Sequence, residues 1–265
     1  MTKAMTTPPK TESPALSLKG KTILVVDDEP GYREVIADEF LFVDATVITA
    51  GSSQEAFALA QAQSVDAVVS DVRMAGGSGL ELLDQLKVIN IRKPVVVLIT
   101  GFSDFAPEDA FNRGVEAVFP KPCNLDRLVE AVYLAILPEN ERWLKPFEPL
   151  SGDFVITLVA ASLEEAIRAH LLSFGRGGMF VQMNGDLPEV ATRVRFSIGL
   201  TSAGDTAFAG LGICRWTRNG KAAELPSGCG IEFLNLTAES VQALAVLLNR
   251  QGPTAFIPKA WPVPT

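Results

Sequence analysis

The first half of the chain alternates short apolar runs with longer stretches in which apolar residues recur every three or four positions. The runs lie at 21–26, 46–50, 65–71, 94–100 and 115–121. Fully apolar runs too short for a helix are typical of strands buried on both faces of a parallel sheet. Helices are predicted over 30–42, from Ser52 or Ser53, over 79–89 with Ser78 as the cap, over 107–113, and from Asn124 or Asp126. This alternation predicts a doubly wound (βα)5 sheet.

The second half changes to short, turn-bounded segments that are typical of strands. They lie at 154–162, 166–174, 177–183, 192–200, 208–216 and 229–236. A helix opened by Thr237 and Ser240 follows them. Residues 164–172 also fit a helical period, and we interpret them as strand. The pattern predicts six antiparallel strands in a small β-barrel that a C-terminal helix closes.

Changes of pattern divide the chain into five parts. We predict a disordered leader (1–19), an α/β domain (20–137), a linker (138–152), a β domain (153–250) and a proline-rich tail (251–265). The tail is expected to pack irregularly or to stay loose. Trp143 and Phe147 are expected to anchor the linker on a domain surface, with a partner interface as the alternative.

Composition excludes several classes of function. Hydrophobic residues make up 48% of the chain and the formal net charge is −8, which favours buried cores and argues against nucleic-acid or anionic-membrane binding. No apolar run reaches the roughly 20 residues that a membrane span needs. Three widely spaced cysteines and one histidine, His170, leave little for a zinc site or a Ser/His/Asp triad. A reduced, cytoplasmic setting is predicted.

Acidic residues end two of the predicted buried strands. Asp27 and Asp28 follow the first strand and Asp71 ends the third, while Thr100 and Lys121 end the fourth and fifth. One aspartate at a strand end is usually a turn former or a helix cap. Strands of a parallel sheet end at one edge, however, and carboxylates gathered there repel each other, so Mg²⁺ is the natural neutraliser. Beside that cation, Asp71 is a candidate nucleophile towards a phosphoryl group.

Residues 20–137 resemble the receiver domain of two-component response regulators. The resemblance rests on VVDDE at 25–29, SDVRM at 70–74, Thr100-Gly101 and Lys121-Pro122. It implies that Asp71 is the phosphoacceptor for a sensor histidine kinase. It also implies that Mg²⁺ is bound by Asp27, Asp28, Asp71 and the backbone carbonyl of Arg73. Thr100 and Lys121 would form the switch pair, and the Lys121–Pro122 bond would be cis. The alternative is a receiver-shaped domain that takes no phosphate.

Three positions depart from that family. Ala75 stands where a proline is usual, which is expected to loosen the loop after Asp71. Val118 occupies the position of the aromatic switch residue, and the adjacent Phe119 is expected to point to the other face of the strand. Cys123 replaces the aromatic residue that normally follows Lys-Pro.

Residues 150–250 resemble a PilZ domain, a bacterial receptor module for cyclic di-GMP. The resemblance rests on segments 177–181, 187–188, 192–196, 212–216 and 230–237. The ligand motifs are degenerate, because 149–153 contains no base and 173–178 keeps only the final Gly178. Arg142, Lys145, Arg176 and Gly178 remain as candidate ligand-binding residues. A protein-binding adaptor that has lost nucleotide binding is the alternative.

These observations predict a response regulator that is not itself an enzyme. Its expected partners are the kinase, a downstream protein and, as an option, a second copy of the chain. A phosphatase that resembles haloacid dehalogenases is disfavoured, because such enzymes carry Asp-x-Asp after the first strand and this chain has Asp27-Asp28-Glu29. No basic recognition helix for DNA is visible.

Overall fold

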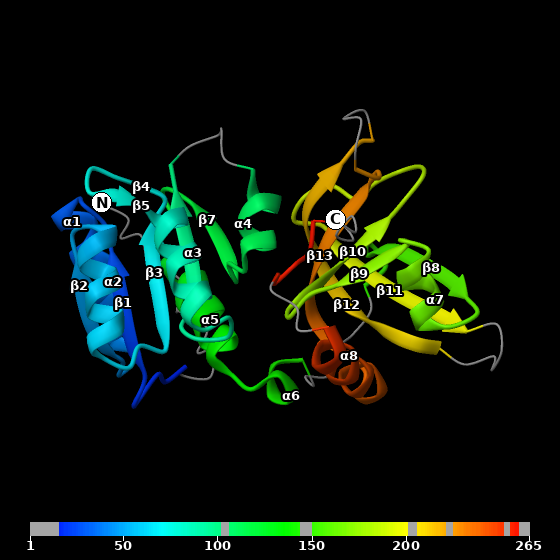
Figure 1. Cartoon of the computed structure of the whole chain (residues 1–265), viewed down its shortest axis with the longest axis horizontal. Helices are drawn as coiled ribbons and strands as arrows, with labels where there is room; N and C mark the ends of the chain where they lie inside the picture. Colours follow the sequence, from blue (N-terminus) through cyan, green and yellow to red (C-terminus); the bar gives the residue numbers. More distant parts are fainter. Residues whose placement is uncertain are drawn as a thin grey trace, which may run out of the picture.

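The structure is a computed structural model that describes residues 16–101, 106–143, 150–200, 206–220, 225–251 and 255–259. It has two lobes, one for each half of the chain (Figure 1). Lys145 and Phe147, and most of the leader and the proline-rich tail, lie outside the described residues.

The first lobe is a five-stranded parallel sheet in the order β2-β1-β3-β6-β7. Its strands are β1 (Thr22–Val26), β2 (Thr46–Ala50), β3 (Ala67–Asp71), β6 (Val95–Thr100) and β7 (Ala117–Pro120). Its helices are α1 (Pro30–Phe42), α2 (Ser53–Ala62), α3 (Gly79–Ile89), α4 (Pro107–Arg113) and α5 (Leu125–Ile136). The predicted (βα)5 domain is confirmed.

Helices cover both faces of this sheet, and each face has its own core. Leu82 and Phe111 pack under α3 and α4 on one face, whereas Phe40 and Leu128 pack under α1 and α5 on the other. Val118 belongs to the first core and Phe119 to the second, as the alternation of side chains along a strand requires.

Side-chain caps fix where several helices begin. Ser52 accepts a hydrogen bond from the N–H of Glu55 (3.2 Å) at α2. Asn124 accepts one from the N–H of Arg127 (3.0 Å) at α5. These caps satisfy backbone donors that the first helical turn leaves unpaired, so the predicted starts are confirmed at Ser52 and Asn124.

The second lobe is a curled, mixed six-stranded sheet in the order β8-β11-β12-β13-β10-β9. Its strands are β8 (Phe154–Ala160), β9 (Leu172–Phe174), β10 (Gly178–Gln182), β11 (Arg193–Leu200), β12 (Thr206–Arg218) and β13 (Gly228–Leu236), followed by α8 (Ala238–Gln251). The prediction of an antiparallel barrel is wrong in part, because β8 and β11 pair in parallel. Among the described residues, no pairing between β8 and β9 closes the sheet.

The segment interpreted as strand from 166 to 174 begins instead as a helix, α7 (Leu163–Arg168), and only then enters β9. Ser162 caps α7 by accepting from the N–H of Glu165 (3.0 Å). Ala166 and Ile167 are buried in the sheet core, which gives this short helix the tertiary support that its length does not supply.

Three predicted boundaries need correction because residues outside the predicted domains are buried. Leu18, placed in the leader, packs under α1, and its N–H donates to the carbonyl of Val43 (2.7 Å). The linker contains α6 (Glu139–Arg142), and Trp143 is buried edge-on against Phe233, 5.8 Å between ring centroids. This confirms Trp143 as an anchor. Residues 255–259 of the tail are packed between the lobes.

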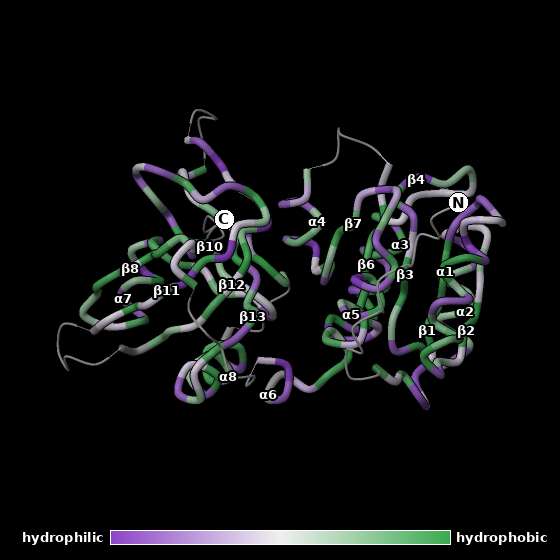
Figure 2. Tube along the Cα trace, turned by 180° about the vertical axis from the view of Figure 1, so that it is seen from behind, coloured by the Kyte–Doolittle hydropathy of each residue, from purple (hydrophilic) through white to green (hydrophobic). Residues whose placement is uncertain are grey.

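The two lobes meet along α4, which faces the strands of the second lobe (Figure 1). Phe180 and Trp216 from the second lobe share a core with Phe111 of α4. Figure 2 shows the lobes from behind, with hydrophobic colour following the strands of both sheets. In the part of the chain that the structure describes, we find no helix long and apolar enough to cross a bilayer.

Candidate functional site

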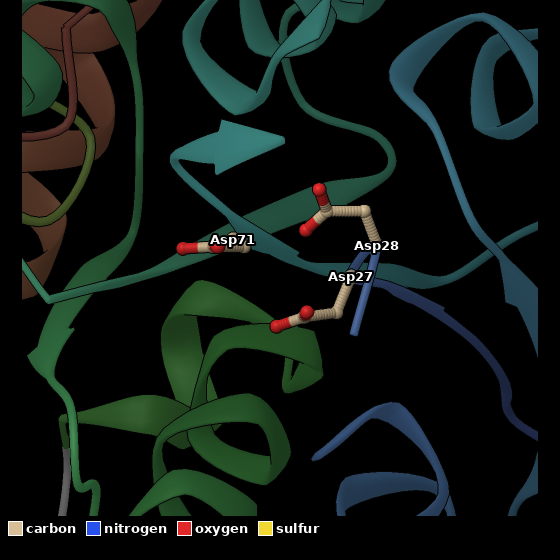
Figure 3. A group of neighbouring side chains, drawn as sticks. All are labelled: Asp27, Asp28 and Asp71. Carbon is tan, nitrogen blue, oxygen red and sulfur yellow. The ribbon is translucent and has the colours of Figure 1, made fainter. Parts of the chain in front are cut away.

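Three carboxylates converge at the carboxyl edge of the parallel sheet (Figure 3). Asp27 and Asp28 follow β1, and Asp71 ends the neighbouring strand β3. One carboxylate oxygen from each of the three lies within 4.8 Å of the others. Asp27 and Asp71 are buried and Asp28 is exposed, so the cluster opens to solvent on one side.

Lys121, which follows β7, reaches into the same cluster. Its Nζ atom lies 2.8 Å from Oδ2 of Asp27 and 3.0 Å from Oδ2 of Asp71. Burial by itself lowers the pKa of Lys121, but its hydrogen bonds to the two carboxylates outweigh this and raise it. Burial raises the pKa of Asp71, and Lys121 opposes that effect. Three acids against one lysine leave an excess of negative charge that fits a divalent cation.

Backbone donors fix the orientation of each carboxylate. Asp27 Oδ1 accepts from the N–H of Glu29 (2.9 Å), and Asp71 Oδ1 accepts from the N–H of Val72 (2.8 Å). Asp28 Oδ2 accepts from the N–H of Ala75 (2.7 Å). The acids are thus held in place before any ligand arrives.

Ala75 is therefore not the loosening substitution that the sequence suggests. Its N–H ties the loop after Asp71 to Asp28, a hydrogen bond that proline cannot donate. The prediction of a looser loop missed this donor, because the sequence shows only that the proline ring is absent and not what the N–H of Ala75 binds.

The same loop is anchored on its far side by a two-residue hairpin, β4 (Arg73–Met74) with β5 (Gly77–Ser78). Gly77 has φ of 113°, a conformation that favours glycine. Ser78 and Glu81 then form a capping box at the start of α3, as predicted for Ser78. The hairpin thereby fixes the backbone of Arg73, two residues after Asp71.

The switch pair lies at the same edge. Thr100 ends β6, the strand next to β3, and is buried. The peptide bond between Lys121 and Pro122 is cis, as the resemblance implies.

Sequence reasoning missed Tyr32 of α1. The Nζ atom of Lys121 lies 4.6 Å from the centroid of the Tyr32 ring, and the Tyr32 hydroxyl donates to Sγ of Cys123 (3.3 Å). Burial, and then this hydrogen bond, raise the pKa of Tyr32 to about 12. Cys123, which replaces the aromatic residue usual in the family, is thus paired with an aromatic residue of α1. The only sequence signal was an aromatic one helical turn after Asp27-Asp28.

The second set of candidate residues meets elsewhere. Arg142 and Arg176 both contact Glu116, whose side chain is 1% exposed, at 3.5 Å and 2.8 Å. Arg176 also donates to the carbonyl of Gly114 (3.1 Å). Gly178 opens β10 and packs against Ile231 and Ile257. The sequence analysis did not identify Glu116 as a candidate site residue.

A cavity of about 550 Å³ adjoins these arginines at the end of the sheet opposite Asp71. Its wall carries Lys21, Arg92 and Lys93 from the loops that lead into β1 and β6, and apolar residues of α5 and α8. The two predicted sites therefore lie at opposite edges of one sheet.

The fold and the acidic site define a doubly wound α/β domain with three aspartates at the carboxyl edge of its sheet that could hold a metal ion. Residues 23–133 match the family described as the response regulator receiver domain, and this part of the chain is such a domain. The match ends at residue 133 and does not include the second lobe.

Curated relatives carry names of regulators. The chain is 28% identical over 222 residues to the Regulator of RpoS of Escherichia coli K12, covering 78% of this chain and 63% of that protein. It is 29% identical over 167 residues to the transcriptional regulatory protein GlrR of the same strain, covering 62% of this chain and 38% of GlrR. The chain thus spans less than two thirds of the length of either relative.

Among solved structures, the chain is similar to the response regulator protein TrrA of Thermotoga maritima in complex with Mg²⁺ and BeF. The identity is 30%, the match covers 43% of this chain and 98% of TrrA, and the TM-score is 0.40.

Proposed function

We propose that the chain is a response regulator in which Asp71 accepts a phosphoryl group from a sensor histidine kinase. The observation that carries this proposal is the convergence of three carboxylates within 4.8 Å around Lys121. Asp27, Asp28, Asp71 and the carbonyl of Arg73 would hold Mg²⁺. When bound, the ion supplies the positive charge that lets a phosphoryl group approach a carboxylate.

In the reaction, a carboxylate oxygen of Asp71 attacks phosphorus while the bond from phosphorus to the donor nitrogen or oxygen breaks. Lys121 leaves Asp71 and pairs with an oxygen of the new phosphoryl group, since its ammonium group is a mobile point charge. The Thr100 hydroxyl donates to another phosphoryl oxygen. The transfer needs no turnover, so the chain acts as a phosphoprotein rather than an enzyme.

The second lobe is the proposed output of this switch. Contacts between the lobes support the relay, because Arg218 of β12 pairs with Glu108 of α4 (3.2 Å) and Arg176 pairs with Glu116, which precedes β7. Because position 118 is a valine, the proposed readout does not use the aromatic switch residue of the family. We propose that the second lobe, a PilZ-like adaptor, presents its surface to a downstream protein in the cytoplasm.

Cyclic di-GMP binding by the second lobe is the alternative. The Nε atoms of Arg142 and Arg176 are buried without a hydrogen-bond partner among the described residues, which favours a ligand that accepts hydrogen bonds. Glu116 opposes it, because this carboxylate already pairs with both guanidinium groups that a phosphate would need. The adaptor is therefore the better supported output, and calorimetry with cyclic di-GMP and the intact chain should give no saturable heat.

The test of the main proposal is incubation of the full chain with acetyl phosphate and Mg²⁺, followed by intact-mass analysis. We expect the gain of one phosphoryl group, and no gain without Mg²⁺ or with Asp71→Asn. Asp66→Asn is the matched control, because Asp66 lies at the opposite end of β3 and should not affect labelling. Equal labelling of the Asp71→Asn chain would overturn the proposal.

A further inference from the structure

The segment 255–259, Ala-Phe-Ile-Pro-Lys, runs between the lobes and divides its backbone hydrogen bonds between them. The N–H groups of Arg176 and Gly177 in the second lobe donate to the carbonyls of Ala255 (3.0 Å) and Phe256 (2.9 Å). The N–H of Phe256 donates to the carbonyl of Phe111 in the receiver (3.0 Å). The segment therefore bonds through its backbone to both lobes at once, without forming a strand with either.

Phe256 and Ile257 are the apolar anchors of the segment and are 3% and 0% exposed. The Phe256 ring stacks on Phe111 of α4 with 6.4 Å between centroids. The guanidinium carbons of Arg142 and Arg176 each lie 5.8 Å from the centroid of the same ring. Two cations and an aromatic residue thus enclose one aromatic side chain, a favourable arrangement for a buried ring.

Glycines form the floor of this groove. A Cβ atom on Gly177 would lie 1.9 Å from the Phe256 ring, and one on Gly175 would lie 2.4 Å from the Phe256 carbonyl oxygen. The close approach of the segment therefore requires glycine at both positions. Gly178, the glycine that the sequence analysis placed in a degenerate nucleotide motif, lies against Ile257, and the neighbouring Gly177 lies against Phe256.

Lys259 fixes the far end of the segment to α4. Its Nζ atom lies 2.7 Å from Oδ1 of Asp109, and its N–H donates to Oδ1 of Asn112 (3.3 Å). Its carbonyl accepts a hydrogen bond from Arg218 of the second lobe (2.7 Å). The same Nζ atom lies 3.8 Å from Oε1 of Glu108, so apolar anchors followed by a lysine that meets two acids give the segment a defined direction.

We propose that the junction of the two lobes is a peptide-binding groove whose resident ligand is this chain's own segment 255–259. The groove selects a short peptide with an aromatic residue, an aliphatic residue and, three positions after the aromatic, a lysine. Tethering keeps the segment at an effective concentration that a free peptide must exceed, so the groove is closed to competitors in the intact chain. The inference rests on none of the phosphoacceptor residues.

The test uses a fluorescein-labelled peptide with the sequence of residues 253–261 and fluorescence anisotropy. The full chain carrying Phe256→Ala loses its own ring from the groove and should bind the peptide. The wild-type chain should bind it at least about tenfold more weakly, because its tethered segment competes. The same peptide with alanine for phenylalanine should bind the Phe256→Ala chain at least about tenfold more weakly than the native peptide.

A pair of glycine variants separates groove binding from adsorption. In the Phe256→Ala chain, Gly177→Ala should abolish peptide binding, whereas Gly152→Ala should preserve it, because a Cβ atom at Gly152 meets nothing within 4 Å. If the Phe256→Ala chain does not fold, the Lys259→Glu chain serves as the host with the same expectations. No binding to a folded host, or equal binding by the two glycine variants, overturns the proposal. Phosphoryl labelling of Asp71 is measured separately and decides only the proposed function.

Discussion

Two charge clusters lie at opposite ends of the same parallel sheet, and they are balanced in opposite ways. At the carboxyl edge, Asp27, Asp28 and Asp71 surround Lys121, so acids are in excess. At the other edge, Arg142 and Arg176 enclose the single Glu116, so bases are in excess. The first cluster is open to solvent at Asp28, whereas the central group of the second is buried.

The difference indicates what each cluster does. An open site with an excess of acids is stabilised when a cation binds, and this suits a reversible switch. A buried acid between two arginines favours an unchanged arrangement, because removal of one partner leaves unpaired charges that are shielded from water. We therefore assign exchange of ligands to the first cluster and cohesion of the lobes to the second.

The largest expected effect tests the cohesive cluster. Glu116→Gln leaves two arginines without a counter-charge and should lower the free energy of unfolding by about 3–5 kcal/mol. Urea unfolding measures this change. Asp84→Asn is the control, since it removes an exposed pair with Arg113 and should cost less than about 1 kcal/mol. Equal losses in the two variants would contradict a special role for Glu116.

The next effect tests the acidic cluster. Mg²⁺ at about 100 times its dissociation constant should raise the free energy of unfolding of the wild-type chain by about 2.7 kcal/mol. Asp27→Asn should remove most of this gain because it deletes a proposed ligand. Asp38→Asn on the exposed face of α1 should keep it. Differential scanning fluorimetry with and without EDTA measures both, and a gain retained in Asp27→Asn would argue against the site.

A smaller effect concerns the hydrogen bond from Ala75 to Asp28. Ala75→Pro removes the donor and should lower the free energy of unfolding by about 1 kcal/mol, a typical value for a hydrogen bond. Ala75→Ser keeps the N–H and should have little effect. Urea unfolding of both variants is the measurement, and a proline variant as stable as the serine variant would mean that the contact contributes nothing.

A last effect is spread over a range of pH and concerns Lys87, which lies near the cohesive cluster. Burial lowers the pKa of Lys87 to about 8 from 10.5, Glu116 opposes this shift and Arg176 adds to it. Between these two values the unfolded chain binds more protons, so the free energy of unfolding should rise with pH, by at most about 1.4 kcal/mol per pH unit. The rise should vanish in Lys87→Met, whose unfolding is compared with that of the wild type across the window. Parallel curves would contradict the shift.

The receiver and its acids were predictable because their signals are local. Each buried strand is one apolar run, and the acids follow those runs directly, as at Val26-Asp27 and Ser70-Asp71. Parallel pairing then brings all the ends to one edge without further information. Capping residues such as Ser78 added the helix starts.

The junction was not predictable because its signals are non-local. Glu116 reads as one polar position in a strand, and only the fold places it beside arginines from 26 and 60 residues away. The parallel pairing of β8 with β11 likewise joins segments separated by two other strands. For Phe256, the one available sign was an apolar triplet, Ala-Phe-Ile, within a proline-rich tail.

Strand β7 is the shortest covalent connection between the two clusters, since it contains only the four residues from Ala117 to Pro120. Glu116 precedes it and Lys121 follows it, so about 16 Å of extended chain separates their Cα atoms. This one short strand therefore carries at its two ends the lysine that meets the acids of the first cluster and the carboxylate that meets the arginines of the second.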